Sequence, residues 1–107
     1  MADKTHLKRD PARCPSHPGA VLRELVLPEV KATKTAVAAA LKLSRNQLHM
    51  ILSEKQPVTP ETAVKLEAAF GGSACMWLGM QAAYDLWHAL RSPEAKKVSR
   101  LSPLVPA

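Results

Sequence analysis

Residues 33–55 constrain the fold most, because two short helical patterns stand there with only a brief break between them. The segment reads T-K-T-A-V-A-A-A-L-K-L-S-R-N-Q-L-H-M-I-L-S-E-K. Val37 and Leu41 are four residues apart and therefore share one face of the first helix. After the break, Ser44 and Gln47 have the spacing of a capping box, in which each side chain binds the backbone N–H of the other residue. The segment predicts a helix, a tight turn and a capped helix, which is the outline of a helix-turn-helix.

The second helix of this segment has one apolar and one polar face when its residues are placed about 100° apart. Leu48, Ile51 and Leu52 cluster on one side, and we expect them to face the core. The polar side includes the first turn, which is the end of a recognition helix that enters the major groove. Arg can bind guanine through two hydrogen bonds, and Asn or Gln can bind adenine in the same way. We therefore predict four base-reading residues: Arg45, Asn46, Gln47 and His49.

Residues 31–55 are also a basic stripe on a mildly acidic central body, although much of the net positive charge lies in the two terminal segments. The chain has 15 Lys and Arg residues against 9 Asp and Glu, a net charge of +6. Within residues 31–55, Lys31, Lys34, Lys42, Arg45 and Lys55 are opposed only by Glu54. A basic stripe of this kind is typical of nucleic-acid binders, and we predict that the DNA backbone is contacted by Lys34, Thr35, Ser44, Ser53 and Lys55. The alternative is an ordinary amphipathic hairpin with a solvated polar face, because charged helix faces are common.

The rest of the chain predicts an all-α fold with three further helices in a single domain of residues 17–90. Pro18 at a first helical position starts a helix that runs to about Leu27, with His17 at its start. Thr59 caps a helix that begins at Pro60 and ends at Gly71-Gly72. Ser73 caps a last helix that continues to about Leu90. For the helix from Pro60 we expect the buried side to include Val64, Leu66, Ala68, Ala69 and Phe70.

The last helix has two apolar stripes, whereas a small core needs only one. One stripe consists of Trp77, Met80, Tyr84 and Trp87, and we predict it as a surface for a second copy or another partner. The other consists of Met76, Ala83, Leu86 and Leu90. A symmetric dimer is favoured, because helix-turn-helix proteins commonly bind two half-sites about one DNA turn apart. The alternative is that both stripes are covered within one chain.

Neither terminal segment has a helical or strand period. Residues 1–16 are expected to form a flexible basic arm, and residues 91–107 are expected to be disordered. Cys14 and Cys75 are predicted to be free thiols of a cytoplasmic protein, since no secretory or membrane-spanning pattern is present. The histidines are spread over different elements, and no nucleophile, metal-ligand or phosphate-binding pattern accompanies them. We therefore expect no enzyme activity, no metal and no cofactor.

Four segments resemble the HigA-type, or VapI-like, antitoxins of the lambda-repressor-like (XRE) helix-turn-helix class. They are H-P-G-A-V-L-R-E at 17–24, L-S-R-N-Q-L at 43–48, V-T-P-E-T-A at 58–63 and W-L-G-M-Q-A-A-Y-D-L-W at 77–87. The resemblance covers residues 17–90 and implies a five-helix fold. Two residues depart from the family pattern, because Lys42 and Glu54 stand where the family usually has Gly. The resemblance therefore predicts that these two residues adopt a left-handed backbone conformation.

The resemblance also implies a function. A HigA-type antitoxin binds operator DNA, represses its own operon and neutralises a toxin, which in this family is a HigB or RelE-like ribonuclease that cleaves messenger RNA. Three other functions remain open at this point, and the third of them, an enzyme, would require activity in the purified chain. A stand-alone transcriptional repressor would share every DNA-related feature, and a pure protein-interaction module would keep the last helix but lack salt-dependent DNA affinity.

Overall fold

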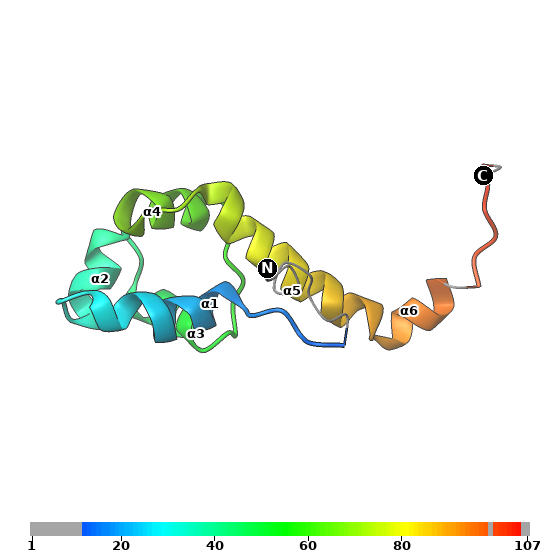
Figure 1. Ribbon diagram of the computed structural model, residues 1–107, viewed down its shortest axis with the longest axis horizontal. Coiled ribbons are helices and arrows are strands. Elements are labelled where there is room, and N and C mark those ends of the chain that lie inside the picture. Colours follow the sequence, from blue (N-terminus) through cyan, green and yellow to red (C-terminus); the bar gives the residue numbers. More distant parts are fainter. Residues whose placement is uncertain (1–11, 99, 106–107) are drawn as a thin grey trace, which may run out of the picture.

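The computed structural model describes residues 12–98 and 100–105, which contain helices and no strand (Figure 1). The elements in chain order are α1 (Pro18–Val21), the π-helical turn η2 (Leu22–Val26), the 3₁₀ turn η3 (Leu27–Glu29), α2 (Lys34–Ala40), α3 (Arg45–Leu52), α4 (Pro60–Phe70), α5 (Ala74–Leu90) and α6 (Pro93–Val98). The all-α fold and the five predicted helices are confirmed, with α1, η2 and η3 together forming the first of them.

Each of the helices from α2 to α5 begins at a hydroxyl side chain that accepts a hydrogen bond from the backbone N–H of the third helical residue. Thr33 accepts from Ala36, Ser44 from Gln47, Thr59 from Thr62 and Ser73 from Met76. These bonds satisfy N–H groups that have no partner within the helix. The caps at Ser44, Thr59 and Ser73 are those predicted from the sequence, because a cap depends only on residues within one turn.

The first helical segment changes its hydrogen bonding near its end. Leu27 N–H binds Leu22 O, five residues back, and Val30 N–H binds Leu27 O, three residues back. Pro28 has no N–H and therefore cannot continue the regular four-residue ladder. The helix widens to a π turn and then tightens to a 3₁₀ turn before it ends.

His17 starts α1 with its ring rather than with a hydroxyl. Its Nδ1 accepts from Gly19 N–H at 2.8 Å, and its ring packs edge-on against Tyr84 with centroids 4.9 Å apart. Burial lowers the pKa of His17 from the ordinary value of 6.5, although the Glu54 and Asp85 carboxylates act in the opposite direction. A protonated Nδ1 could not accept this hydrogen bond, so the folded state requires the neutral ring.

Stability is therefore expected to decrease as the pH falls below about 6.5, until the folded-state pKa of His17 is reached. In this window the unfolded chain binds more protons than the folded chain, and protonation favours unfolding. Urea unfolding at about pH 7.5 and about pH 5.5 measures the effect. His17→Asn keeps a good cap without titrating and should reduce the difference. An equally large difference in this variant would assign it to another group.

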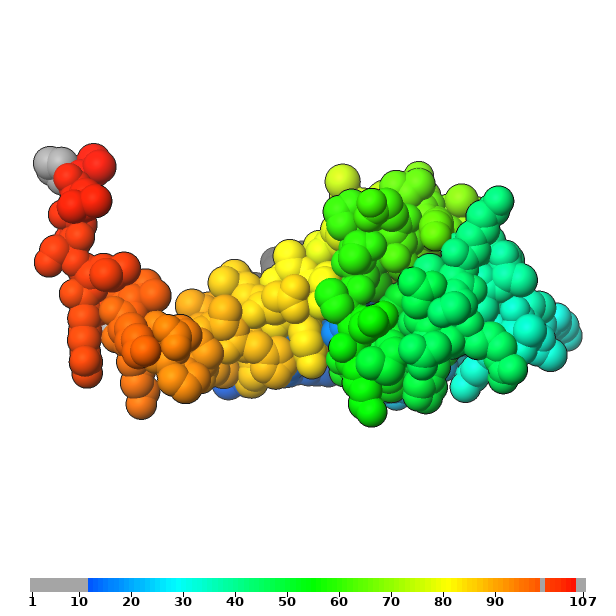
Figure 2. Space-filling model, turned by 180° about the vertical axis from the view of Figure 1, so that it is seen from behind, coloured from blue at the N-terminus to red at the C-terminus, as the bar shows by residue number. Residues whose placement is uncertain are grey.

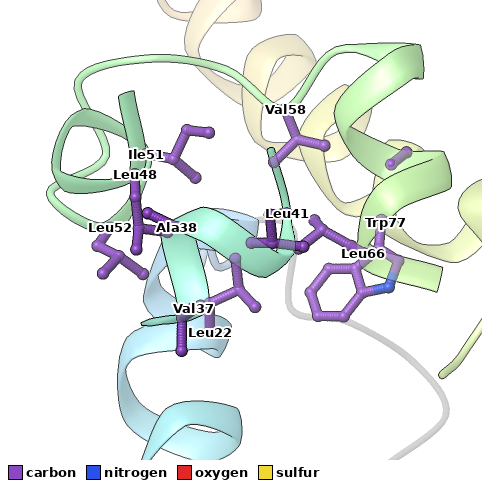
Figure 3. Close-up of a cluster of buried hydrophobic side chains, with 11 residues drawn as sticks. Leu22, Val37, Ala38, Leu41, Leu48, Ile51, Leu52, Val58, Leu66 and Trp77 are labelled. Atoms are coloured by element: carbon purple, nitrogen blue, oxygen red, sulfur yellow. The ribbon is translucent and has the colours of Figure 1, made fainter. Parts of the chain in front are cut away.

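The core collects side chains from η2, α2, α3, α4 and α5 and from the segments between them (Figure 3). It consists of Leu22, Val37, Ala38, Leu41, Leu48, Ile51, Leu52, Val58, Ala63, Leu66 and Trp77. Ala38 is 2% exposed, and its small side chain allows α2 and α3 to pack closely. The core therefore joins the two helices of the predicted helix-turn-helix to α4 and α5.

The predicted buried side of α4 is only partly correct. Leu66 is buried and Phe70 is half-buried, but Val64 is 60% exposed, and Ala68 and Ala69 are also exposed. The residues that α4 buries are Thr62, Ala63 and Leu66. The helix is apolar on more than one side, so its sequence pattern did not identify the side that meets α5.

The prediction for the last helix is wrong at Trp77, which belongs to the core. Its ring is 2% exposed, and its Nε1–H donates to Gly71 O at 3.2 Å. Met80, Tyr84 and Trp87 are half-buried, and Tyr84 packs against His17. The second stripe lies in solvent instead, with Met76 45%, Leu86 59% and Leu90 63% exposed.

The second half of α5 extends away from the body of the molecule, and α6 lies beyond it (Figure 2). The prediction of disorder is therefore wrong for Pro93–Val98, where Pro93 and Glu94 open a helix and Lys96 and Lys97 lie in its last turn. This charge order favours a helix, because acidic residues stabilise the N-terminal turn and basic residues the C-terminal turn.

The predicted N-terminal arm lies largely outside the described residues, which begin at 12. At its end Pro15 is buried, and Cys14 Sγ lies 3.7 Å from His88 Nε2 of α5, so these residues pack on α5 instead of forming part of a free arm. Cys14 and Cys75 are both free thiols. Among the described residues no helix combines the length and the apolar character that crossing a membrane requires.

Candidate nucleic-acid interface

The outer face of α3 presents all four predicted base-reading side chains to solvent. Arg45, Asn46, Gln47 and His49 are exposed, whereas Leu48, Ile51 and Leu52 on the other face are buried. The helix start is held by the predicted capping box: Ser44 N–H donates to Gln47 Oε1 at 2.8 Å, and Gln47 N–H donates to Ser44 Oγ at 3.0 Å. The first turn of α3 is therefore ordered before anything binds to it.

The capping box separates the roles of the two amides in this turn. The side-chain oxygen of Gln47 already accepts from Ser44 N–H, so a bond to adenine through both polar atoms of Gln47 would have to break the box. The side chain of Asn46 is exposed and makes no hydrogen bond within the part of the chain that the structure describes. Asn46 is therefore the better placed amide for bidentate contact, and Gln47 retains its two N–H donors.

A cleft of about 370 Å³ lies between the start of α2 and the face of α3. Its lining brings together four of the predicted site residues, namely Lys34, Arg45, Asn46 and His49, with Leu48 and Leu52 behind them. Lys34 comes from α2 and the others from α3. The turn thus places a cation beside the predicted base-reading residues, as phosphate contact next to a groove requires.

The predicted backbone-contacting residues are not all equally accessible. Lys34, Thr35, Ser44 and Lys55 are exposed. Ser53 is half-buried, and its hydroxyl donates to His49 O at 2.8 Å within α3. Ser53 would have to give up this bond in order to donate to a phosphate, which makes it the weakest member of the set.

Both turns that flank α3 contain a residue in the left-handed conformation, as expected at the two positions that depart from the family pattern. Lys42 has a φ of 56° and Glu54 a φ of 65°. Such a conformation is costly for a residue with a Cβ. At the first turn, Lys65 Nζ donates to Lys42 O at 3.3 Å.

Arg23 of η2 supports the second turn, and sequence reasoning did not assign it this role. It donates to Leu52 O at 2.6 Å and to Glu54 Oε2 at 3.3 Å. The hydrogen bond to Glu24, together with Glu54, raises the pKa of Arg23. Arg23 thereby binds a carbonyl at the end of α3 and the side chain of the left-handed residue after it. No local pattern connects Arg23 to α3, because the two are brought together only by packing.

Gln81 of α5 is a second residue that sequence reasoning left without a role. It is 6% exposed, accepts from Val58 N–H at 2.8 Å and donates to Asp85 Oδ1 at 3.0 Å. The bond from Val58 N–H ties the loop after α3 to α5. Gln81 follows Trp77 by four residues and therefore lies on the same, buried side of α5. A polar residue on that side was the sign in the sequence that Gln81 could have a buried partner.

No group of three or more His, Cys, Asp or Glu side chains is placed to hold a metal ion in residues 12–98 and 100–105. The exposed face of α3, the adjoining cleft and the Ala-rich packing of α2 instead define the molecule as a helix-turn-helix protein. A family model described as helix-turn-helix matches residues 22–77.

Similarity to known proteins identifies a narrower group within the helix-turn-helix class. Virulence-associated protein I of Dichelobacter nodosus is 43% identical over 70 residues, which are 65% of this chain and 65% of that protein. A structure of Pseudomonas aeruginosa antitoxin HigA with the higBA promoter has a TM-score of 0.75 at 31% identity and covers 85% of this chain and 99% of its own. Antitoxin GraA in complex with its operator has a TM-score of 0.77 at 28% identity, with coverage of 92% and 99%.

The chain belongs to the helix-turn-helix family and, within it, to the HigA-type (VapI-like) antitoxins. Proteins of this family include an antitoxin and proteins named as helix-turn-helix transcriptional regulators, and the family is not one of enzymes.

Proposed function

We propose that this protein is the antitoxin of a toxin–antitoxin module, which binds operator DNA as a dimer, represses its own operon and neutralises a ribonuclease toxin of the HigB or RelE type in the cytoplasm. The observation that carries the DNA-binding half is the cleft in which Lys34 of α2 lies beside Arg45, Asn46 and His49 of α3. The structures of GraA in complex with its operator and of Pseudomonas aeruginosa HigA with the higBA promoter support it.

The proposed mechanism relies on α3 being conformationally ordered before DNA binds. The capping box and the bonds from Arg23 hold the helix at both ends, so little ordering has to accompany DNA binding. Arg45 and Asn46 contact base edges in the major groove, with Gln47 and His49 beside them. Lys34, Thr35, Ser44 and Lys55 contact phosphates and set the position of the helix.

We propose that the dimer forms through the exposed stripe of α5, which replaces the stripe predicted first. Met76, Leu86 and Leu90 are large and exposed, while Gly79 and Ala83 between them are small enough to let a second helix approach. A contiguous apolar stripe of this kind is costly to leave in water. Two copies of α5 would cover it and place two α3 helices on successive half-sites.

Charge in this stripe is expected to separate the two copies. The double variant Leu86→Glu/Leu90→Glu should weaken the dimer at least about a hundredfold, because each buried Leu contributes on the order of 1.5 kcal/mol. Sedimentation velocity measures the mass, and circular dichroism checks that the helices remain. Ala89→Glu adds a charge to α5 outside the stripe and should leave the dimer intact. A double variant that remains dimeric would show that α5 is not the interface.

Lys55→Ala is expected to weaken binding to all DNA sequences alike. It should also reduce the slope of log affinity against log salt by about one unit per subunit, because one phosphate contact is lost. Fluorescence anisotropy at several salt concentrations measures this slope. Lys97→Ala, on α6 away from the α2–α3 surface, serves as the control. An unchanged slope in Lys55→Ala would remove Lys55 from the backbone-contacting residues.

Toxin binding is supported by membership of the antitoxin family, and no residue is assigned to it. The test of the whole proposal is a titration of DNA from upstream of this gene at two salt concentrations, with and without the product of the neighbouring gene. Specific, salt-dependent binding that responds to that product supports an antitoxin. Specific binding without any interaction with that product supports the stand-alone repressor, and absence of specific binding contradicts both.

A further inference from the structure

A second and larger hollow lies on the molecule away from the proposed DNA-contacting residues. It is a groove of about 490 Å³ lined by α2, α4 and the segment before α2. The lining residues that matter here are Ala36, Ala40, Lys42, Lys65, Ala68 and Ala69. None of these residues belongs to the set proposed to contact bases or phosphates.

The groove exists because its walls are made of short side chains. Ala36 and Ala40 of α2 line it together with Ala68 and Ala69 of α4, and all four are exposed. Behind them the groove reaches the buried core residues Val37 and Leu41. A mostly apolar hollow of roughly 300–1,000 Å³ is typical of sites for small ligands. The walls therefore favour a flexible, aliphatic ligand.

The charged groups of the groove are all of one sign. Its only ionisable lining residues are Lys42 and Lys65. Lys65 Nζ lies 3.3 Å from Lys42 O, which places this ammonium group at the turn between α2 and α3. Within the part of the chain that the structure describes, neither lysine forms an ion pair with a carboxylate. A cationic end on an apolar groove is complementary to a ligand with an anionic head.

We propose that the groove between α2 and α4 binds an amphipathic monocarboxylate with a straight aliphatic chain, with the carboxylate at Lys42 and Lys65 and the chain between the alanine rows. A carboxylate can accept charge-assisted hydrogen bonds from ammonium groups and needs no metal to do so. The site goes beyond the proposed function, because neither DNA nor a toxin is needed for it.

The test is isothermal titration of the full chain with decanoate in the absence of DNA, with decylamine and octanoate for comparison. We expect one site per chain, no binding of decylamine at that site, and up to about a fourfold loss of affinity for each methylene removed. Equal binding of decanoate and decylamine, or no saturable binding of decanoate, would overturn the proposal. Because DNA is absent, the result does not depend on whether the proposed DNA function is correct.

Variants locate the site. Ala40→Leu fills the groove and should weaken decanoate at least about tenfold, since one wall would occupy the space of the chain. Ala39→Leu, an exposed position of the same helix outside the lining, should have no effect. Lys65→Met removes the charge and keeps an apolar stem, and should weaken decanoate about fivefold, whereas Lys31→Met should not. Equal effects within either pair would overturn the assignment. A change in the oligomeric mass of Ala40→Leu would also overturn the assignment, because the groove would then be a contact between two copies of the chain.

Discussion

Gly19→Ala is expected to destabilise the fold by about 3 kcal/mol, the sum of a severe overlap and a lost helix cap. A Cβ at Gly19 would lie 1.8 Å from Ile51 O and 2.9 Å from Ile51 C. Both atoms belong to the backbone of α3, so no side-chain rotation can relieve the overlap. The first helix would have to move away from α3, and the bond from Gly19 N–H to His17 Nδ1 would be lost with it.

Urea unfolding followed by circular dichroism, at one protein concentration, measures this loss. Leu25→Ala is the control, because Leu25 of η2 is 70% exposed. There we expect a change within about 0.5 kcal/mol, since surface substitutions that break no special contact rarely do more. A Gly19→Ala variant as stable as the native protein would mean that α1 does not pack on Ile51 as described.

Arg45→Ala and Asn46→Ala are each expected to cost about 1–3 kcal/mol of binding free energy on the operator, a loss of roughly fivefold to a hundredfold in affinity. Both side chains are exposed and lie in the cleft beside Lys34. Neither is used in the capping box, so their removal should leave α3 folded. Affinity for random DNA should change much less, because contacts to bases carry the sequence preference.

Anisotropy titrations on operator and random DNA at the same salt concentration measure the difference. Lys55→Ala provides the contrast, since a phosphate contact should weaken both DNAs equally. A matching loss on random DNA in Arg45→Ala or Asn46→Ala would show that these residues contact the backbone instead of bases. No loss on either DNA would mean that the face of α3 is not the DNA-binding surface.

Local features of the fold followed from the sequence because they depend on residues within about one helical turn of each other. The caps at Ser44, Thr59 and Ser73 are of this kind, as is the capping box that orders α3. The polar first turn of α3 was also predictable, because a helix with one apolar face must turn the other outward. The left-handed turns at Lys42 and Glu54 came from the family pattern and are present in the structure.

Tertiary structure alone decided which face is buried wherever a helix is apolar on more than one side. In α5 it selected Trp77 for the core and left Leu86 and Leu90 exposed, and in α4 it buried Ala63 while exposing Val64. Residues distant in sequence also became partners, such as Arg23 with Leu52 and Gln81 with Val58. The groove between α2 and α4 is another result of packing. A period in the sequence can show that a helix has apolar faces, but which one is covered depends on where its neighbours lie.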